Sequence, residues 1–268
     1  DTYGFPVDIV QDVIRDENIS LDMAGFDQAM ERQRTRSRSV ATFDQISDAY
    51  KNLSARGIKP EFVGYGTLTA DSKILVIVAD GHEINEAGQG QQVEIVTEAT
   101  PFYAESGGQI GDAGTITGPD FEMAVRDTIK DPTGLIIHKG KVISGRAQKG
   151  AVVSLRVDDA RRRATALNHT ATHILHAVLR QVLGEHVKQA GSLVAADRLR
   201  FDFTHFSLVD RDTLDTIERL VNLRIRENVP TNTQEMDADD AFKSGATALF
   251  EEKYGDRVRV VSLTDFSK

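Results

Sequence analysis

The spacing of hydrophobic residues changes twice along the chain. In the first region the spacing is helical, and Met23, Phe26 and Met30 form one apolar stripe. In the second, short runs rich in β-branched residues alternate with Gly, Asp, Asn and Pro turns, as in strands. Helical and strand-like patterns alternate in the third. We therefore predict an α+β fold with three parts: a helical segment over residues 1–56, a small β-barrel over 57–157 and an α+β core over 158–268.

The third region begins with the longest helical pattern in the sequence. It predicts a helix of roughly 25 residues that starts at Asp158 and stops at Gly184, a residue type that often ends helices. Strands are expected around 186–194 and 198–206, and a second helix over 210–228, followed by a short strand, a helix near 238–243 and a final strand. The expected apolar face of the first helix comprises Leu167, Ala171, Ile174, Leu175, Val178, Leu179 and Val182.

Composition narrows the classes of function. The 268 residues include 32 Lys and Arg, 41 Asp and Glu, and no cysteine. The lack of cysteine excludes a disulfide framework, a thiol nucleophile and a Cys-ligated zinc site built by this chain alone. No apolar run approaches the roughly 20 residues of a membrane span. Because the first residues have neither an initiator Met nor a signal-peptide layout, we expect the chain to be an internal part of a longer protein.

An acidic chain with a net charge of −9 contains a basic stretch after residue 155. Residues 156–200 carry eight positive and four negative side chains, and Arg161, Arg162 and Arg163 are consecutive. Such a stretch is what selective contact with a polyanion would need, so these three arginines are candidates for binding RNA phosphates. The alternative is a solvated start of the helix.

The pattern His-Thr-Ala-Thr-His on the long helix is the most specific chemical signal. His169 and His173 are four residues apart, so they lie on one face and could bind one metal ion together. Position 170 is threonine, where a zinc protease of the HExxH type has its glutamate base, so peptide hydrolysis is disfavoured. Two histidines on a half-buried helix face are the alternative, because zinc normally takes three or four protein ligands.

A glycine-rich stretch in the second region, TPFYAESGGQIGDAG, has no regular pattern of its own. Its Gly107-Gly108 pair between polar residues predicts a loop whose backbone comes close to another group. A tight turn between two strands is the alternative.

Four motifs, in order, resemble the alanyl-tRNA synthetase family. DTYGFPVDI is similar to the segment that leads into the family's editing region, and TPFYAESGGQIGDAG is similar to its glycine-rich barrel motif. NHTATHILHAVLRQVLGEHVKQAGSLV with RLRFDFTHF resembles the editing core, and ALFEEKYGDRVRVVSLTDFS resembles the approach to its last part. The resemblance covers essentially the whole chain and implies an editing core of the threonyl/alanyl-tRNA synthetase type.

The resemblance also implies a site. Zn²⁺ would be bound by His169 and His173 together with a later Cys-x-x-x-His pair, which this sequence does not contain. Thr172, Gln189, Gly107 and Gly108 would lie in or face the editing pocket. ATP and Mg²⁺ would serve only the aminoacylation part of the family's enzymes, which would precede residue 1.

By this resemblance, the expected activity is hydrolysis of tRNA for alanine mischarged with serine or glycine. The expected partners are that tRNA and its seryl or glycyl esters, with no membrane and no DNA, in the cytoplasm. The alternative is a tRNA-binding or structural module without catalysis, whose barrel and basic stretch grip the acceptor end.

Overall fold

A computed structural model describes residues 22–23, 25–26, 50, 55, 57, 59–237, 240–241 and 257–262. The chain forms two compact units, residues 1–48 and 49–268. In the first unit, the Asp22 carboxylate accepts a hydrogen bond of 2.8 Å from the backbone N–H of Gly25, and its carbonyl accepts one of 3.0 Å from Phe26, as at a helix start. The rest of the predicted helical segment lies outside the described residues.

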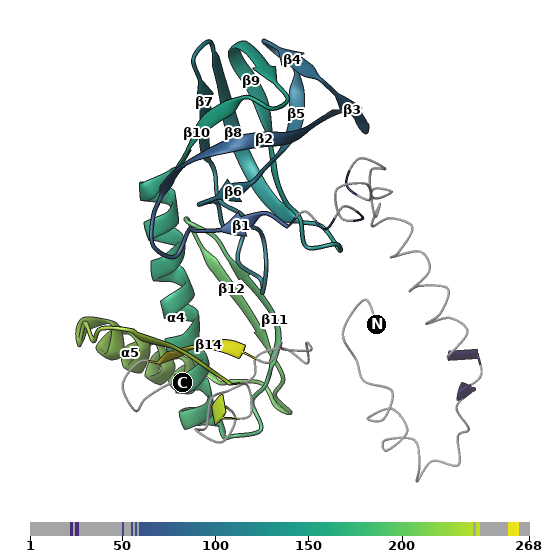
Figure 1. Ribbon diagram of the computed structural model, residues 1–268. Coiled ribbons are helices and arrows are strands. Elements are labelled where there is room, and N and C mark those ends of the chain that lie inside the picture. Colours follow the sequence, from purple (N-terminus) through teal and green to yellow (C-terminus); the bar gives the residue numbers. More distant parts are fainter. Residues whose placement is uncertain are drawn as a thin grey trace. The chain divides into compact units, whose positions relative to one another are not determined.

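Six antiparallel strands of the second unit close into the predicted barrel (Figure 1). Their order is β10–β7–β8–β9–β5–β2, and β2 pairs again with β10. Short strands flank the barrel, and residues 63–68, between β1 and β2, form a loop. The strands are β1 (Glu61–Phe62), β2 (Thr69–Ala79), β3 (His82–Ile84), β4 (Glu86–Gly88), β5 (Gln92–Thr97), β6 (Ala99–Thr100), β7 (Gly114–Gly118), β8 (Phe121–Lys130), β9 (Ile136–Gln148) and β10 (Val152–Val157).

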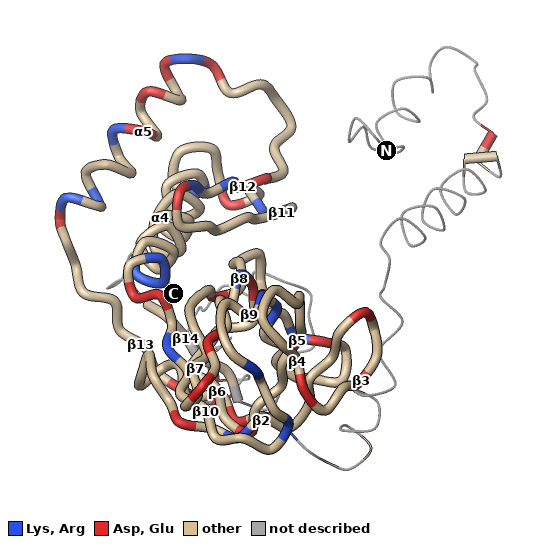
Figure 2. Tube along the Cα trace, turned by 90° about the horizontal axis from the view of Figure 1, so that it is seen from above, with Lys and Arg blue, Asp and Glu red and all other residues tan. Residues whose placement is uncertain are grey.

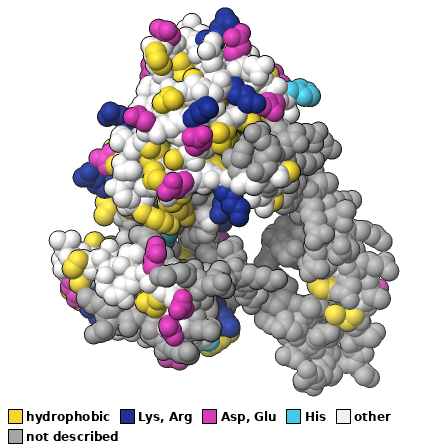
Figure 3. Space-filling model, viewed as in Figure 1, with side chains coloured by type: hydrophobic (Ala, Val, Ile, Leu, Met, Phe, Trp, Pro, Cys, Tyr) yellow, Lys and Arg dark blue, Asp and Glu magenta, His cyan; other side chains and the backbone are white. Residues whose placement is uncertain are grey.

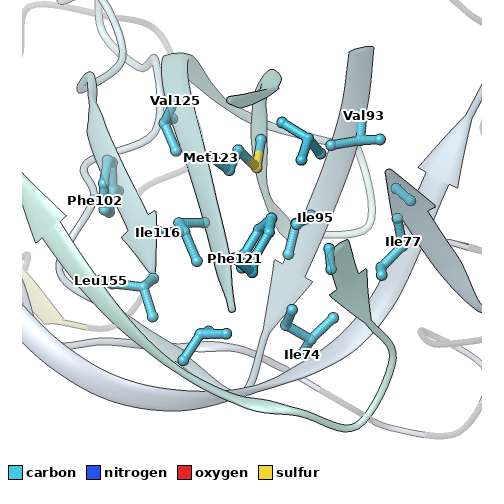
Figure 4. Packing of buried hydrophobic residues seen from close by; sticks show 14 of the residues in the cluster. Ile74, Ile77, Val93, Ile95, Phe102, Ile116, Phe121, Met123, Val125 and Leu155 are labelled. Carbon is cyan, nitrogen blue, oxygen red and sulfur yellow. The ribbon is translucent and has the colours of Figure 1, made fainter. Parts of the chain in front are cut away.

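The barrel interior is filled by alternate residues of its strands, because successive side chains of a strand point to opposite faces (Figure 4). In β10 this alternation buries Val153 and Leu155 and exposes Val152. Ile116 and Met123 on β7 and β8 are fully buried. Burying each large apolar side chain contributes roughly 1.5–3 kcal/mol, so the barrel is a stable support for the loops at its ends.

One histidine is part of the barrel interior. His138 on β9 is fully buried; its Nδ1 donates to the carbonyl of Ile95 at 2.9 Å, so its Nε2 accepts from the Thr100 hydroxyl at 2.7 Å. Burial lowers the pKa of His138 to about 4. The ring is therefore neutral at pH 7 and its role is structural.

The predicted long helix is confirmed as α4 (Asp159–Leu183, 25 residues), with both predicted ends. The Asp158 side chain accepts from the N–H of Arg161, and the N–H of Gly184 donates to the carbonyl of Arg180. Asp158 thus caps the first turn, and Gly184, at φ +115°, ends the last.

The second half of α4 packs against the remaining elements of the α+β core. These are the β11 (Gln189–Val194) and β12 (Leu199–Phe203) hairpin and α5 (Arg211–Arg226), while β13 (Asn232–Asp237) pairs with β14 (Arg257–Ser262). Buried Ile174, Val178 and Ile217 join the two helices. Leu167 was expected on this face but is 68% exposed, because the first half of α4 buries Thr165 and Thr172 instead.

Charged residues of both signs are interspersed along the outer face of α5 (Figure 2). Arg211 pairs with Asp215, and Arg224 with Glu227, each within one turn. Such exposed pairs contribute only about 0.3–0.5 kcal/mol, so α5 is held by its buried face. No helix among the described residues is long and apolar enough to cross a membrane.

Candidate functional site

A cavity of about 110 Å³ lies where the glycine-rich loop of the barrel meets α4 and the β11–β12 hairpin. It brings together five of the residues that the sequence singled out: Gly107, His169, Thr172, His173 and Gln189. The other lining residues are Tyr103, Ser106, His176, Ser192, Val194 and Phe201. The cavity therefore combines parts of two regions that the sequence pattern treats as separate.

The glycine-rich loop is joined to β11 by backbone hydrogen bonds. Val194 donates to the carbonyl of Gly108 at 2.8 Å, Ile110 donates to the carbonyl of Val194 at 3.0 Å, and Gln109 forms a parallel bridge with Val194. Gly108 has φ +81°, and a Cβ there would lie 2.6 Å from the carbonyl oxygen of Ser192. The predicted close approach of this loop to another group is thus confirmed. Gly107 lines the cavity, and Gly108 packs against the backbone of Ser192.

A buried ion pair fastens the start of α4 to the same loop. The Arg162 guanidinium binds the Asp112 carboxylate, with Nε 2.9 Å from both oxygens, and it also donates to the carbonyls of Gly64 at 3.0 Å and Pro101 at 2.8 Å. The backbone N–H of Tyr103 donates to Asp112 as well. Arg162 and Asp112 therefore fix the helix that carries the histidines relative to the loop that faces them.

This geometry corrects the expectation for one of the three arginines. Arg162 was a candidate for RNA binding, but its guanidinium faces the protein and is engaged by three acceptor groups. Arg161 is exposed, and Arg163 is exposed and pairs with Asp159 at 2.8 Å. The view in Figure 3 shows charges of both signs dispersed over the barrel. Only Arg161 and Arg163 stay candidates for phosphate contact.

The His169 and His173 side chains lie face to face, with ring centroids 5.0 Å apart and planes 12° apart. His169 Nδ1 donates to the side-chain oxygen of Gln109 at 2.6 Å. Burial, and then the neighbouring His169 and His176, lower the pKa of His173 to about 4. His173 is therefore neutral at pH 7, and a neutral imidazole is the form that binds metals or accepts protons.

The two imidazoles fit two positions of a zinc site. Gln109 orients His169 as the outer partner of a metal-bound histidine usually does. In the part of the chain that the structure describes, no group of three or more His, Cys, Asp or Glu side chains could hold a metal ion. The donor set is thus right in type, and two further ligands would be needed. Sequence reasoning placed Gln109 in this loop but did not assign its contact with His169.

Two further predicted residues have defined roles in the cavity wall. The Thr172 hydroxyl is buried and donates to the carbonyl of Asn168 at 2.8 Å, so its oxygen is left as an acceptor only. Gln189 lines the cavity from the first position of β11, opposite Phe203. The amide of Gln189 can donate a hydrogen bond to a carbonyl oxygen.

His176 is a cavity residue to which sequence reasoning gave no role. It lies one turn beyond His173, is only 8% exposed, and its ring packs on Phe201 with centroids 5.2 Å apart. Burial lowers the pKa of His176; a hydrogen bond to the backbone of Val187 raises it, and nearby Arg180 lowers it. The sequence signal that could have identified His176 is its spacing, which makes it a third histidine on the helix face of His169 and His173.

Comparisons with known proteins agree on one family. The family described as "tRNA synthetases class II (A)" matches residues 1–161. Over the whole chain the sequence is 60% identical to an alanine--tRNA ligase of Desulfosudis oleivorans, covering 31% of that protein. It is 49% identical to the alanine--tRNA ligase of Methylococcus capsulatus, covering 30%, and 47% identical to that of Mesorhizobium japonicum. The chain thus spans about a third of the length of these relatives.

Proposed function

The chain belongs to the class II (A) tRNA synthetase family, and on this premise we propose that it is the proofreading part of an alanine--tRNA ligase. In this proposal it hydrolyses the ester that joins serine or glycine to tRNA for alanine. The observation that supports it best is the cavity shared by the glycine-rich loop, α4 and β11, with the neutral imidazole of His173, the imidazole of His169 and an amide in its wall.

The need for such a site follows from the size of alanine. A synthetic site that accepts alanine cannot strongly exclude glycine, which is smaller, or serine, which adds only a hydroxyl. Differences of this kind give about 10- to 200-fold discrimination, and a second, hydrolytic site removes the errors. A cavity of about 110 Å³ has room for a small aminoacyl group.

The side chains of the cavity supply complementary functions for ester hydrolysis. The amide of Gln189 would donate to the ester carbonyl, on which negative charge develops during attack by water. The acceptor oxygen of Thr172 would hold one hydrogen of that water. A zinc ion bound at His169 and His173 would add a positive charge that stabilises the oxyanion. No carboxylate lines the described cavity, so we assign no general base of that type.

The proposal includes tRNA as partner, with the acceptor end entering the cavity and Arg161 and Arg163 contacting its phosphates. Both arginines lie on the first turn of α4, which carries His169 two turns further on. Phosphate contacts of this kind make the binding constant for tRNA fall with salt concentration. The slope of log K against log[salt] should become less steep for each arginine removed.

A deacylation assay tests the proposal. Seryl-, glycyl- and alanyl-tRNA for alanine are incubated with the 268-residue chain, and with a chimera in which the chain replaces the matching segment of the Desulfosudis oleivorans ligase. We expect the chimera to hydrolyse the seryl and glycyl esters at least tenfold faster than the alanyl ester. His169→Ala and His173→Ala should each abolish most of this activity. Binding of tRNA without hydrolysis by either protein would refute the proposal and favour a non-catalytic module.

A further inference from the structure

His176 offers a buried hydrogen-bonding atom that the protein does not use. Its Nε2 has no hydrogen-bond partner among the described residues and is closed to bulk water. The hydrogen bond of the ring to the backbone of Val187 must therefore use Nδ1, which donates to the carbonyl. Nε2 then carries a lone pair. A buried acceptor without a partner is destabilising, so it calls for an explanation.

The ring of His176 belongs to the wall of the cavity, while its Nε2 is closed to solvent. His176 lines the cavity together with Thr172, which is one turn before His176 on α4. Phe201 packs against the imidazole and Val187 holds its other nitrogen, so the ring is fixed except for small turns toward the cavity. A group that enters the cavity and has an O–H to donate would satisfy Nε2 after such a turn.

We propose that His176 Nε2 accepts a hydrogen bond from the side-chain hydroxyl of a seryl ester and so distinguishes serine from alanine. This inference rests on the proposed function. The hydroxyl of serine pairs the lone pair, whereas the methyl group of alanine fills the same space and leaves the lone pair unpaired. Glycine has no side chain, and a water molecule can take the place of the hydroxyl. Such a site accepts both erroneous esters and rejects the correct one.

A neutral hydroxyl suits this position better than the ammonium group of the amino acid. The positive charge of Arg180 acts on His176 and would also repel an ammonium placed on Nε2. Thr172 cannot replace His176 as a fixed donor or sole reader, because its own hydrogen is already donated to Asn168. Because the proposed hydrolysis uses the Thr172 oxygen for the attacking water, the acceptor left for the hydroxyl of serine is His176 Nε2, which has no hydrogen-bond partner among the described residues.

The first test uses stable analogues in which serine, alanine or glycine is joined by an amide to 3′-amino-3′-deoxyadenosine. Binding to the wild-type chimera is measured by calorimetry, and the ¹⁵N resonance of His176 Nε2 is followed by NMR. We expect the seryl analogue to bind about 10- to 100-fold more tightly than the alanyl analogue and to shift this resonance. Seryl binding that leaves the resonance unmoved would overturn the inference.

The second test compares hydrolysis by two variants. His176→Phe keeps a ring on Phe201 but removes the acceptor, so we expect kcat/KM for the seryl ester to fall about 10- to 100-fold and that for the glycyl ester to change less than about threefold. In His176→Gln the amide oxygen can take the place of Nε2, and part of the seryl activity should return. Equal losses on both esters would contradict a role in reading the hydroxyl.

Different results would refute the proposed function and the inference about His176. A chimera that hydrolyses no ester, yet binds the seryl analogue at least tenfold better than the alanyl analogue, would refute the proposed function and support His176 as the acceptor. A chimera that hydrolyses both erroneous esters but binds the seryl and alanyl analogues equally would overturn the inference alone.

Discussion

Replacing Arg162 by alanine tests whether the buried ion pair holds α4 to the glycine-rich loop. The Arg162 side chain is 18% exposed and the Asp112 side chain 6%. Alanine would leave that carboxylate buried without its cation and two carbonyls without a donor. Breaking a buried pair in this way costs about 3–5 kcal/mol, and we expect the lower end because Arg162 is partly exposed.

The measurement is urea unfolding of the 268-residue chain, followed by circular dichroism. Arg163→Ala is a matched control: the same residue type, one position on, is 73% exposed, and we expect a change within about 0.5 kcal/mol. Arg162→Lys keeps the charge but loses the planar fork, so its loss should be intermediate. A loss below about 1 kcal/mol for Arg162→Ala, or equal losses for the two alanine variants, would refute our account of the pair.

Three further predictions concern the barrel and the loop. The pKa of His138 is about 4 in the fold and 6.5 in a free histidine, so the unfolded state binds the proton first, and the free energy of unfolding should fall by up to about 3 kcal/mol as pH drops from 6.5 to 4. In His138→Gln the free energy of unfolding, measured with urea at each pH, should depend less on pH. An unchanged pH dependence would contradict this. Gln109→Leu should remove one hydrogen bond that orients His169 and lower zinc affinity or ester hydrolysis about 10- to 100-fold, measured by zinc titration and deacylation; wild-type values would argue against the orienting role. Gly108→Ala should cost at least 1 kcal/mol more in urea unfolding than Gly90→Ala, since both have positive φ but a Cβ at Gly90 meets nothing within 4 Å; equal costs would exclude the predicted clash.

The parts of the fold that depend on local chemistry could be predicted from the sequence. The ends of α4 are fixed by a capping carboxylate at Asp158 and a glycine at Gly184, and both effects act within a few residues. The barrel strands follow from a two-residue alternation that has only one buried face. The buried face of α4 was predicted less accurately. Leu167 is exposed, and Thr165 and Thr172 are buried instead.

The residues of the candidate site could be predicted from the sequence, but the contacts between them could not. His169 and His173 are related by one helical turn, so their pairing is local. Arg162 and Arg163 are the same residue type in adjacent positions, and only the docking of the barrel loop decides which one is buried. The free nitrogen of His176 likewise results from the meeting of α4 with the β11–β12 hairpin. These contacts are long-range, and no periodic pattern encodes them.

The hydrogen bond between Gln109 and His169 joins residues 60 positions apart, and the bridge from Gln109 to Val194 reaches further still. Contacts between such distant positions form late, because a long loop must close before they give any stability. During synthesis on the ribosome, the barrel can fold before the end of β11 has left the exit tunnel. A nascent chain stalled between these two points would therefore have a folded barrel but not yet the cavity between the glycine-rich loop, α4 and β11.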